Sequence, residues 1–409
     1  MPPPFPKTSV LLARQPIMDE SRRVLGYELL YRGLREREES FDTTATARVI
    51  CETLSHIGAE RVVGPARMFI NLGQDLLESG AAEVLASVLP AGQGVIEILE
   101  GVEASAEGLK AVARLRAQGV LVALDDFAFQ PGVTPFLDHA DYVKVDVLAA
   151  GAGLAALAER LRPYGIPLIA EKVESLAVAK ACADLGFQYF QGYFFARPEE
   201  QDGERVGVQA HSVITLLSEL QRPEGAPAAL AETIGRDVAL SHQILRLANS
   251  AAFRRRRAVS SLIDAVVLLG QDVIRQWASL LLMARLATHK PRELLSMALV
   301  RARLCQKIGE PFTDLEPNVL FTAGLLSVLD ALLDKPMVTV VNELPLGNNL
   351  RDALLGEKNS KLALTLRRAI ACETGQWNTL ATEERNAAAS LLEAYVEALE
   401  FARRTLAAS

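Results

Sequence analysis

Residues 120–127 read Val-Leu-Val-Ala-Leu-Asp-Asp-Phe, an apolar run that stops at two adjacent carboxylates. An apolar run without polar alternation is typical of a parallel strand that is buried on both faces. The first half of the chain contains seven apolar runs of this kind, and they finish at polar or charged residues: Glu28, Asn71, Glu97, Asp125, Lys144, Glu171 and Gln191. The repetition predicts strands that bring reactive side chains to one edge of a sheet.

Strand-like runs alternate with helix-like stretches throughout this half. The strands are predicted at residues 9–13, 24–31, 67–71, 94–99, 120–125, 142–147, 166–171 and 189–195, and the helices at 43–57, 106–118, 152–162 and 176–185. This alternation is typical of a TIM-like β/α barrel or of a doubly wound sheet. No glycine-rich turn follows the first strand, which weakens the doubly wound alternative. In a barrel the carboxyl ends of the strands meet at one mouth, where active sites lie.

The second half of the chain has a different pattern. Residues 199–205 are polar and charged, which is typical of a domain boundary. Beyond them, apolar spacing and helix propensity predict helices at 212–221, 227–235, 240–249, 261–269, 272–287, 292–308, 319–333, 349–355, 358–371 and 382–407. The expected fold class is therefore α/β plus all-α. A β/α barrel domain is expected over residues 1–200 and an all-helical domain over residues 201–409.

The composition indicates an ordinary soluble protein. The 409 residues carry a formal net charge of -7, which gives no general attraction to nucleic acid or to anionic membranes. The four cysteines are widely spaced and form neither a zinc pattern nor a disulfide framework. The N-terminal residues lack the features of a secretion signal, and no uncharged apolar run approaches the length of about 18 residues that spans a bilayer. We expect a cytoplasmic protein without membrane or nucleic-acid contacts.

The residues at the strand ends indicate metal and phosphate chemistry. Carboxylate and amide oxygens suit a hard divalent cation such as Mg²⁺ or Mn²⁺. The adjacent Asp125 and Asp126 are able to hold one ion and share a second, as paired-metal phosphodiester hydrolysis requires. Lys144 is suited to orient water or to neutralise a phosphoryl oxygen, and Arg32 to clamp a phosphate. The alternative is that these residues are ordinary polar side chains on the rim of the barrel.

Seven motifs of this half occur in the order known from one family. Residues 26–32 read Gly-Tyr-Glu-Leu-Leu-Tyr-Arg, residues 124–127 read Leu-Asp-Asp-Phe, and residues 143–146 read Val-Lys-Val-Asp; the others are 69–71, 96–100, 169–174 and 191–193. Together they resemble the motifs of the EAL family. That family comprises cyclic-di-GMP phosphodiesterases built on a β/α barrel whose first strand runs against the others.

The resemblance implies three sets of site residues. The metal ligands would be strand-end side chains, with Asp126 at a second ion: Glu28, Asn71, Glu97, Asp125, Asp126 and Glu171. The catalytic residues would be Lys144, which assists the attacking water, together with Glu171 and Asp126. The remaining ligand-binding residues would be Arg32, which contacts a phosphate, Gln191, which lines the pocket, and Glu100, which anchors a loop.

The chain also departs from the family pattern. The Glu-Ala-Leu signature reads Glu28-Leu29-Leu30, and residues 128–132 read Ala-Phe-Gln-Pro-Gly where the family has a Gly-Thr-Gly-Tyr-type loop. Lys172 stands where the family has a glycine, so a bulky cation lies beside the site. A site that keeps its metal ligands but lacks the loop that aligns them should lose much of its turnover rate, because misplacement of a group by about 1 Å can cost 10²-fold in rate.

Three functions are compatible with this pattern. The first is a bacterial signalling protein whose divergent EAL domain is weakly active or inactive and acts by binding cyclic-di-GMP or a protein. The second is an active Mg²⁺- or Mn²⁺-dependent phosphodiesterase that produces the linear dinucleotide. The third is a protein-binding scaffold with an empty barrel mouth. EAL domains often pair, so the resemblance also implies a homodimer.

The second half resembles the HDOD module, a helical domain related to metal-dependent HD phosphohydrolases. The resemblance lies in residues 237–253 and 259–270, and it implies an interaction or output module that contacts a regulatory protein. This half has three histidines, His211, His242 and His289, and no His-Asp dipeptide, so we expect no catalysis there. The basic run 254–257 is either a solvated loop, a phosphate contact or a docking site for an acidic partner.

Overall fold

The computed structural model of the chain describes residues 10–33, 58–89, 92–198, 208–220, 226–249, 259–344, 346–357, 360–380 and 388–408. The chain forms two compact units. The first unit comprises Met1–Phe195 and Ile370–Glu400, and the second comprises Ala196–Ala369 and Phe401–Ser409. The predicted classes are confirmed, because the first unit contains a closed barrel and the second is helical in its described residues.

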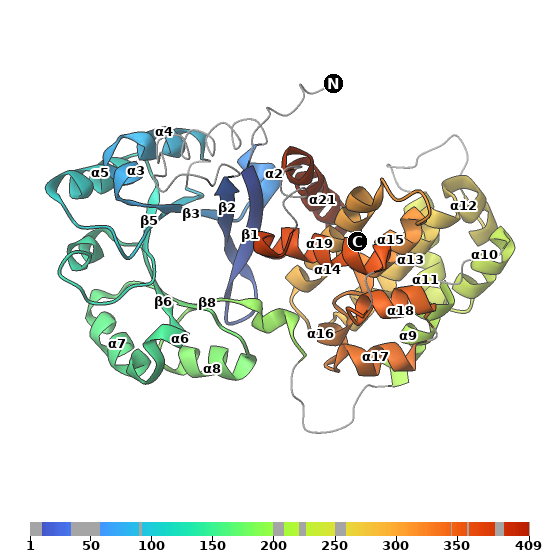
Figure 1. Ribbon diagram of the computed structural model, residues 1–409. Coiled ribbons are helices and arrows are strands. Elements are labelled where there is room, and N and C mark those ends of the chain that lie inside the picture. Colours follow the sequence, from blue (N-terminus) through green and yellow to red (C-terminus); the bar gives the residue numbers. More distant parts are fainter. Residues whose placement is uncertain are drawn as a thin grey trace. The chain divides into compact units, whose positions relative to one another are not determined.

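Eight strands close the barrel in sequence order (Figure 1). They are β1 (Val10–Asp19), β2 (Val24–Gly33), β3 (Arg67–Leu72), β4 (Gly94–Ile98), β5 (Leu121–Leu124), β6 (Tyr142–Asp146), β7 (Leu168–Glu171) and β8 (Tyr189–Gln191). Strand β1 pairs antiparallel with both β2 and β8, and all other pairs are parallel. The reversed first strand agrees with the resemblance seen in the sequence.

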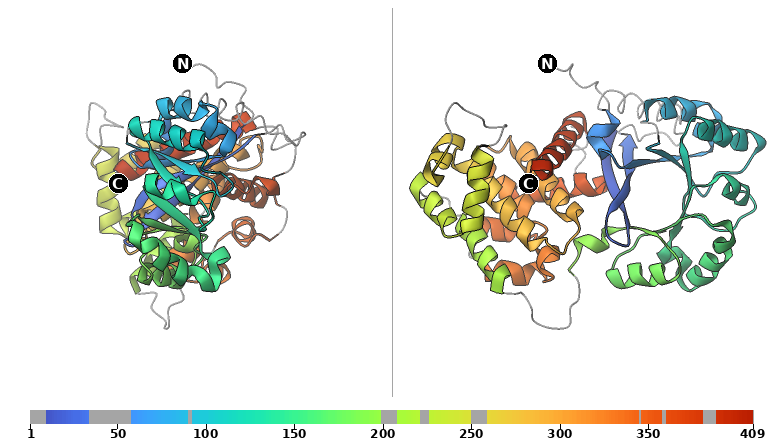
Figure 2. Two further views of the ribbon diagram at one scale, coloured as in Figure 1. Left: turned by 90° about the vertical axis from the view of Figure 1, so that its left-hand side faces the viewer. Right: turned by 180° about the vertical axis from the view of Figure 1, so that it is seen from behind.

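Helices lie outside the strands, as both views in Figure 2 show. They are α2 (Ala59–Val63), α3 (Gln74–Glu78), α4 (Ala81–Val88), α5 (Ala106–Ala117), α6 (Val147–Ala150), α7 (Leu154–Leu161) and α8 (Leu176–Asp184). The hydroxyl groups of Ser105 and Ser175 cap α5 and α8 by accepting hydrogen bonds from backbone N–H groups in their first turns. The predicted helices at 106–118, 152–162 and 176–185 are confirmed, and the one at 43–57 lies outside the described residues.

The interior of the barrel contains an apolar layer below a polar one. The apolar layer consists of Ile17, Phe69, Val95, Ala123, Tyr142 and Ile169, all buried. Successive side chains on a strand point to opposite faces, so the residue two positions further along points to the same interior. On β3 to β7 these next residues are Asn71, Glu97, Asp125, Lys144 and Glu171. The period of the strand thus places the polar side chains in one layer.

A segment from the far end of the chain packs against β1, β2 and α2. These two strands form a hairpin, so no crossover helix lies between them. The backbone N–H of Arg14 donates to the hydroxyl of Tyr395 at 3.2 Å, and Arg61 forms an ion pair with Glu400 at 2.5 Å. Gly375 lies so close to β2 that a Cβ on it would be 3.0 Å from the side chain of Leu30. Ile370–Glu400 therefore belongs to the barrel unit, whereas the sequence analysis assigned it to the helical domain.

The helices of the second half are α9 (Val208–Leu220), α10 (Pro227–Gly235), α11 (Val238–Ala248), α12 (Leu262–Leu269), α13 (Gln271–Leu286), α14 (Arg292–Gly309), α15 (Pro317–Leu326), α16 (Leu329–Leu333), α17 (Met337–Glu343), α18 (Asn348–Leu354), α19 (Lys361–Thr374) and α21 (Ala388–Ala408). The single helix predicted at 319–333 is wrong, because the chain breaks between α15 and α16. Helix α17 was not predicted. Asn249, at the end of α11, exchanges hydrogen bonds with the backbone of Val259 and so joins two helices.

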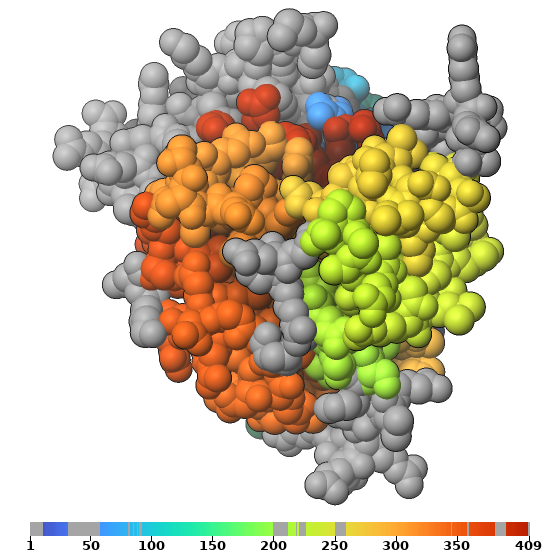
Figure 3. Space-filling view, turned by 90° about the vertical axis from the view of Figure 1, so that its right-hand side faces the viewer, coloured from blue at the N-terminus to red at the C-terminus, as the bar shows by residue number. Residues whose placement is uncertain are grey.

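Figure 3 shows the face of the helical unit where α10 to α12 lie, in yellow-green to yellow. Three apolar side chains on α11 and α12 are exposed: Val238, Ile263 and Val267. The side chains of His242 and His289 are exposed as well, and residues 254–257 lie outside the described part of the chain. Among the described residues no single helix is long and apolar enough to cross a membrane; α12 and α13 pass that test only as a pair bent by 117°.

We predict that Gly192→Ala destabilises the barrel. Gly192 has a φ of +149°, and a Cβ at this position would lie 2.0 Å from the carbonyl oxygen of Val173. Because backbone atoms cannot yield as a flexible side chain does, we expect a loss of about 3 kcal/mol or more in the free energy of unfolding. Urea denaturation followed by circular dichroism measures this loss.

Gly153→Ala is the matched control for this substitution. Gly153 has a negative φ of -81°, and a Cβ there would meet nothing within 4 Å. We expect a change within about 0.5 kcal/mol for this variant. Equal stability of the two variants would show that the close approach of β8 to Val173 is not required.

Candidate functional site

The ammonium group of Lys144 lies at the centre of the polar layer. Its Nζ is 2.7 Å from Glu97, 2.8 Å from Asp125, 2.9 Å from Glu171 and 3.1 Å from Glu28. Glu97, Asp125 and Glu171 stand at the C-terminal ends of their strands or directly after them, whereas Glu28 lies in the middle of β2, which continues to Gly33. The side chains of Lys144 and Glu97 are fully buried, and the other three are almost so. The convergence predicted from the strand ends is therefore present in the structure.

Glu28 is held by three donors. Asn71 donates to its Oε1 at 2.7 Å, and Gln191 donates to its Oε2 at 2.6 Å, in addition to the bond from Lys144. Gln191 also donates to Gln15 at 3.1 Å, on the antiparallel strand β1. The sequence analysis missed Gln15. Since β1 runs in the opposite direction, its contribution to this layer comes two residues before Ile17 rather than two residues after it.

The protonation of the cluster follows from its burial and charge. Burial opposes the charge of Lys144, but the surrounding carboxylates outweigh it and raise its pKa well above the usual value. Burial raises the pKa of Glu97 well above its ordinary value, and the Glu28 carboxylate adds to this. Burial also raises the pKa of Glu171, to about 8. The pKa of Glu28 is lowered, because Lys144 and its amide donors together exceed the effect of burial. One ammonium group thus supports Glu28 as an anion, while Glu171, with a pKa of about 8, retains its proton at neutral pH.

Asp126 points to a second cation, the ammonium group of Lys172. Lys172 Nζ lies 3.8 Å from Asp126 Oδ2 and forms a short ion pair with Asp146. Asp146 ends β6 and also caps α6, where its Oδ1 accepts from the backbone N–H groups of Leu148 and Ala149. The sequence analysis did not select Asp146 as a site residue, although it stands directly opposite Glu171 in the register of β6 and β7.

The remaining predicted residues have different surroundings. Glu100 is exposed after β4, and its charge helps to raise the pKa of Asp126, which burial raises most. Arg32 lies on β2, and its side chain is outside the described residues. Tyr31, which was not predicted, donates from its hydroxyl to the backbone carbonyl of Asn71 at 2.8 Å. Burial and the carboxylates of the site raise its pKa to about 12, so it stays a donor.

Several oxygens of the cluster have no hydrogen-bond donor although they are buried: Asn71 Oδ1, Glu97 Oε2, Asp126 Oδ1, Glu171 Oε2 and Gln191 Oε1. Buried oxygens without donors are uncommon in folded proteins and need a reason. Carboxylate and amide oxygens are the ligands that Mg²⁺ and Mn²⁺ prefer, so the donor set fits a divalent cation. Within the described ranges, however, no three His, Cys, Asp or Glu side chains are arranged as an ion site. The Lys144 ammonium group occupies the centre instead.

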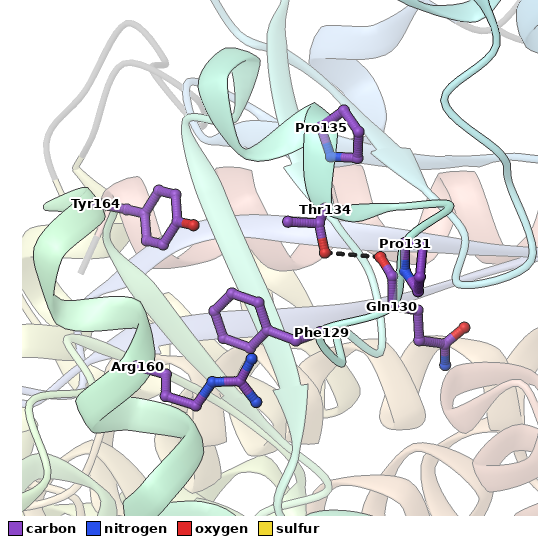
Figure 4. A pocket seen from close by; sticks show the side chains of 7 residues that line it. All are labelled: Phe129, Gln130, Pro131, Thr134, Pro135, Arg160 and Tyr164. Atoms are coloured by element: carbon purple, nitrogen blue, oxygen red, sulfur yellow. Dashed lines mark hydrogen bonds between the residues drawn. The ribbon is translucent and has the colours of Figure 1, made fainter.

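A shallow hollow lies beside the loop that follows β5 (Figure 4). Its volume is about 670 Å³, and its lining includes Phe129, Gln130, Thr134, Arg160 and Tyr164. The guanidinium of Arg160 stacks 3.9 Å above the ring of Phe129. The carboxylates of the barrel interior do not line this hollow. The stacked side chains are already in contact with one another, so the chemistry of the chain lies in the carboxylate cluster.

Both halves of the chain match known domain families. The EAL domain family matches residues 7–198, and the HDOD domain family matches residues 208–335. The cyclic di-GMP phosphodiesterase CdgJ of Vibrio cholerae is 34% identical over 363 residues, which are 86% of this chain and 82% of CdgJ. The chain belongs to the EAL–HDOD family. It is a member of this group of bacterial signalling proteins, and its match to CdgJ spans both domains.

A second relative has nearly the same length. The uncharacterized protein YuxH of Bacillus subtilis is 31% identical over 413 residues, covering 96% of this chain and 98% of YuxH. Among solved structures, a calcium and cyclic di-GMP complex of BlrP1 from Klebsiella pneumoniae is 22% identical, with a TM-score of 0.40. That likeness covers 48% of this chain and 58% of BlrP1.

We predict that Glu171→Gln changes the pH dependence of stability. The pKa of Glu171 is about 8 in the folded chain, against an ordinary value of 4.5, so folding favours its protonated form. The stabilisation that folding gains from this protonated carboxyl group is fully present below about pH 4.5 and is lost as the pH rises to about 8. Glutamine cannot ionise. The free energy of unfolding of Glu171→Gln relative to the natural chain should therefore rise between pH 5.5 and 8.5, by on the order of 1–3 kcal/mol.

Urea denaturation in the presence of a chelator measures this difference without metal ions. Glu159→Gln serves as the control, because Glu159 is two-thirds exposed and forms an ion pair with the equally exposed Arg162. It should show no such trend with pH. A relative stability of Glu171→Gln that stays constant across this range would contradict the assignment of the raised pKa.

Proposed function

We propose that the barrel of this chain binds cyclic di-GMP together with a divalent cation, Mg²⁺ or Mn²⁺, and hydrolyses it slowly or not at all. The observation that carries this proposal is the convergence of the motif side chains around Lys144, with buried oxygens that lack donors. A site that served only as a protein scaffold would have no need of four buried carboxylates, since each costs free energy to bury. The name of the relative CdgJ supports the choice of ligand.

Each side chain has a part in this proposal. The cation ligands are the strand-end carboxylates and amide: Glu28, Asn71, Glu97, Asp125 and Glu171, with Asp126 beside them. The cation neutralises the excess negative charge of the cluster and polarises a phosphoryl oxygen when it is bound. Lys144 orients water or a phosphate oxygen, Gln191 fixes Glu28 and lines the pocket, Arg32 contacts a phosphate and Glu100 anchors the neighbouring loop. Asn71 is oriented in turn, because Tyr31 holds its backbone carbonyl.

Hydrolysis to the linear dinucleotide is the second candidate. In this reaction a water oxygen forms a bond to phosphorus and the P–O3′ bond breaks. The water gives a proton to a neighbouring carboxylate or to solvent, and the departing 3′-oxygen takes a proton from a carboxyl group or solvent to become a hydroxyl. The specific support is the name of CdgJ and the complete set of strand-end carboxylates around Lys144. The ion pairs of Lys172 argue for slow turnover, since they engage Asp126 and Asp146 beside the cluster.

We propose that the HDOD half passes the state of the barrel to a regulatory protein. The support is the family match over residues 208–335 and the joint match of both domains to CdgJ. Pairing of barrels into a homodimer and a place in the cytoplasm belong to the same proposal. The division into domains at residue 200 also remains a proposal, with Ile370–Glu400 as the part that packs in the barrel unit.

A titration with cyclic di-GMP in the presence of Ca²⁺ tests the binding function. Ca²⁺ takes oxygen ligands as Mg²⁺ does, but its looser geometry is poorly suited to in-line attack. Isothermal titration calorimetry should show saturable binding to the natural chain. Glu97→Gln should weaken it at least tenfold, because the fully buried side chain could no longer give up a proton and bind the cation as a carboxylate. The exposed control Glu159→Gln should bind as the natural chain does. Absence of saturable binding would leave only the scaffold function.

Incubation with Mn²⁺ or Mg²⁺ tests the second candidate. Chromatography of the nucleotides should show little linear dinucleotide, at a rate roughly 10²-fold or more below a typical lower value of about 1 s⁻¹ for enzymes. Glu28→Ala should remove whatever product forms, because it removes a carboxylate that Lys144 contacts directly. Product formation at an ordinary enzymatic rate, abolished by Glu28→Ala, would establish the active phosphodiesterase in place of the slow one.

A further inference from the structure

Lys172 occupies an unusual position at the mouth of the barrel. It directly follows Glu171 at the end of β7, and its φ of +55° lies in the left-handed region that glycine adopts most easily. Asp126, which follows β5, has a similar φ of +42°. A long side chain is disfavoured in this conformation, so its interactions have to compensate. Both residues therefore turn out of their strands in the same unusual way.

The interactions of Lys172 are with carboxylates of two other strand ends. Its ammonium group forms a short ion pair with Asp146 and lies 3.8 Å from Asp126 Oδ2. Asp126 and Lys172 are within two residues of the carboxylates that surround Lys144, namely Asp125 and Glu171. An ammonium group thus lies beside the first cluster, between two acidic side chains, Asp126 and Asp146, that are not among the four carboxylates around Lys144.

The electrostatic consequence is a full positive charge where an adjacent divalent ion would have to be. Paired-metal sites hold their ions about 3.5–4 Å apart, and adjacent carboxylates such as Asp125 and Asp126 bridge or divide them. The Oδ1 of Asp126 is buried without a donor, while its Oδ2 faces Lys172. A divalent ion bound by Asp126 would stand close to the ammonium group and be repelled by it.

We propose that the Lys172 ammonium group is a built-in cation that takes the place of a second divalent ion, so that this barrel mouth binds one divalent cation and not two. The inference rests on the proposed function, because it assumes that one ion binds among Glu97, Asp125 and Glu171. It adds a specificity-determining residue to that site. The number of bound ions, and through it the rate of any hydrolysis, is set by a side chain outside the carboxylate cluster.

The number of Mn²⁺ ions bound per chain tests this inference without measuring activity. Equilibrium dialysis followed by elemental analysis gives the number, and electron paramagnetic resonance detects magnetic coupling between neighbouring Mn²⁺ ions. The natural chain should bind one uncoupled Mn²⁺ in the cluster. Lys172→Gly and Lys172→Gln should bind a second ion and show coupling, because both remove the charge. Lys172→Arg keeps the charge and should bind one.

A further substitution locates the second ion. Asp126→Asn introduced into the Lys172→Gly chain should return the number to one and abolish the coupling, because the ligand of the second ion is removed. Lys172→Gln guards against an effect of backbone strain, since it retains a long side chain at the same φ. Thermal denaturation of each variant establishes that it is folded before its ions are counted.

The outcomes separate this inference from the proposed function. Two coupled ions in the natural chain, or a single ion in both Lys172→Gly and Lys172→Gln, would overturn the inference and leave cation-dependent binding of cyclic di-GMP intact. A natural chain that binds neither Mn²⁺ nor cyclic di-GMP would overturn both. One ion in the natural chain and two coupled ions in both neutral variants would support both.

Discussion

The contact between one lysine and four carboxylates governs the interior of this barrel. Lys144 is fully buried, and its charge is stable there only because Glu28, Glu97, Asp125 and Glu171 surround it. The reverse also holds, since four carboxylates could not be buried around an empty centre. Protons on some of these carboxylates reduce the remaining negative charge when no other cation is present. Under the proposed function, a divalent cation would displace these protons when it binds.

Much of this arrangement could be predicted from the sequence, because both the barrel and its site obey a local rule. Apolar runs indicate buried parallel strands, and a barrel gathers their ends at one mouth. The period of two along a strand then carries each polar residue to the interior, as with Phe69 and Asn71 or Val95 and Glu97. The helices of the second half followed from spacing in the same way, apart from the break between α15 and α16 and the unpredicted helix α17.

The contacts that were missed depend on the fold as a whole. Gln15 belongs to the site because β1 runs antiparallel, which reverses the direction in which its residues must be counted. The pairing of Lys172 with Asp146 depends on a left-handed backbone at Lys172 and on the register of β6 and β7. The packing of Tyr395 against β1 joins residues at opposite ends of the sequence. Neither propensity nor periodicity contains information on such contacts.

The late segment that packs against β1, β2 and α2 has a consequence for the biosynthesis of the protein. A ribosome makes the chain from its N-terminus, and domains generally fold as they emerge. All eight strands are complete once Gln191 has been added. Tyr395, which contacts β1, and Glu400, which pairs with Arg61 on α2, follow only after most of the helical unit has been translated. During that interval the nascent barrel displays an unshielded hairpin surface. Molecular chaperones that recognise exposed apolar strands can bind the hairpin during this interval.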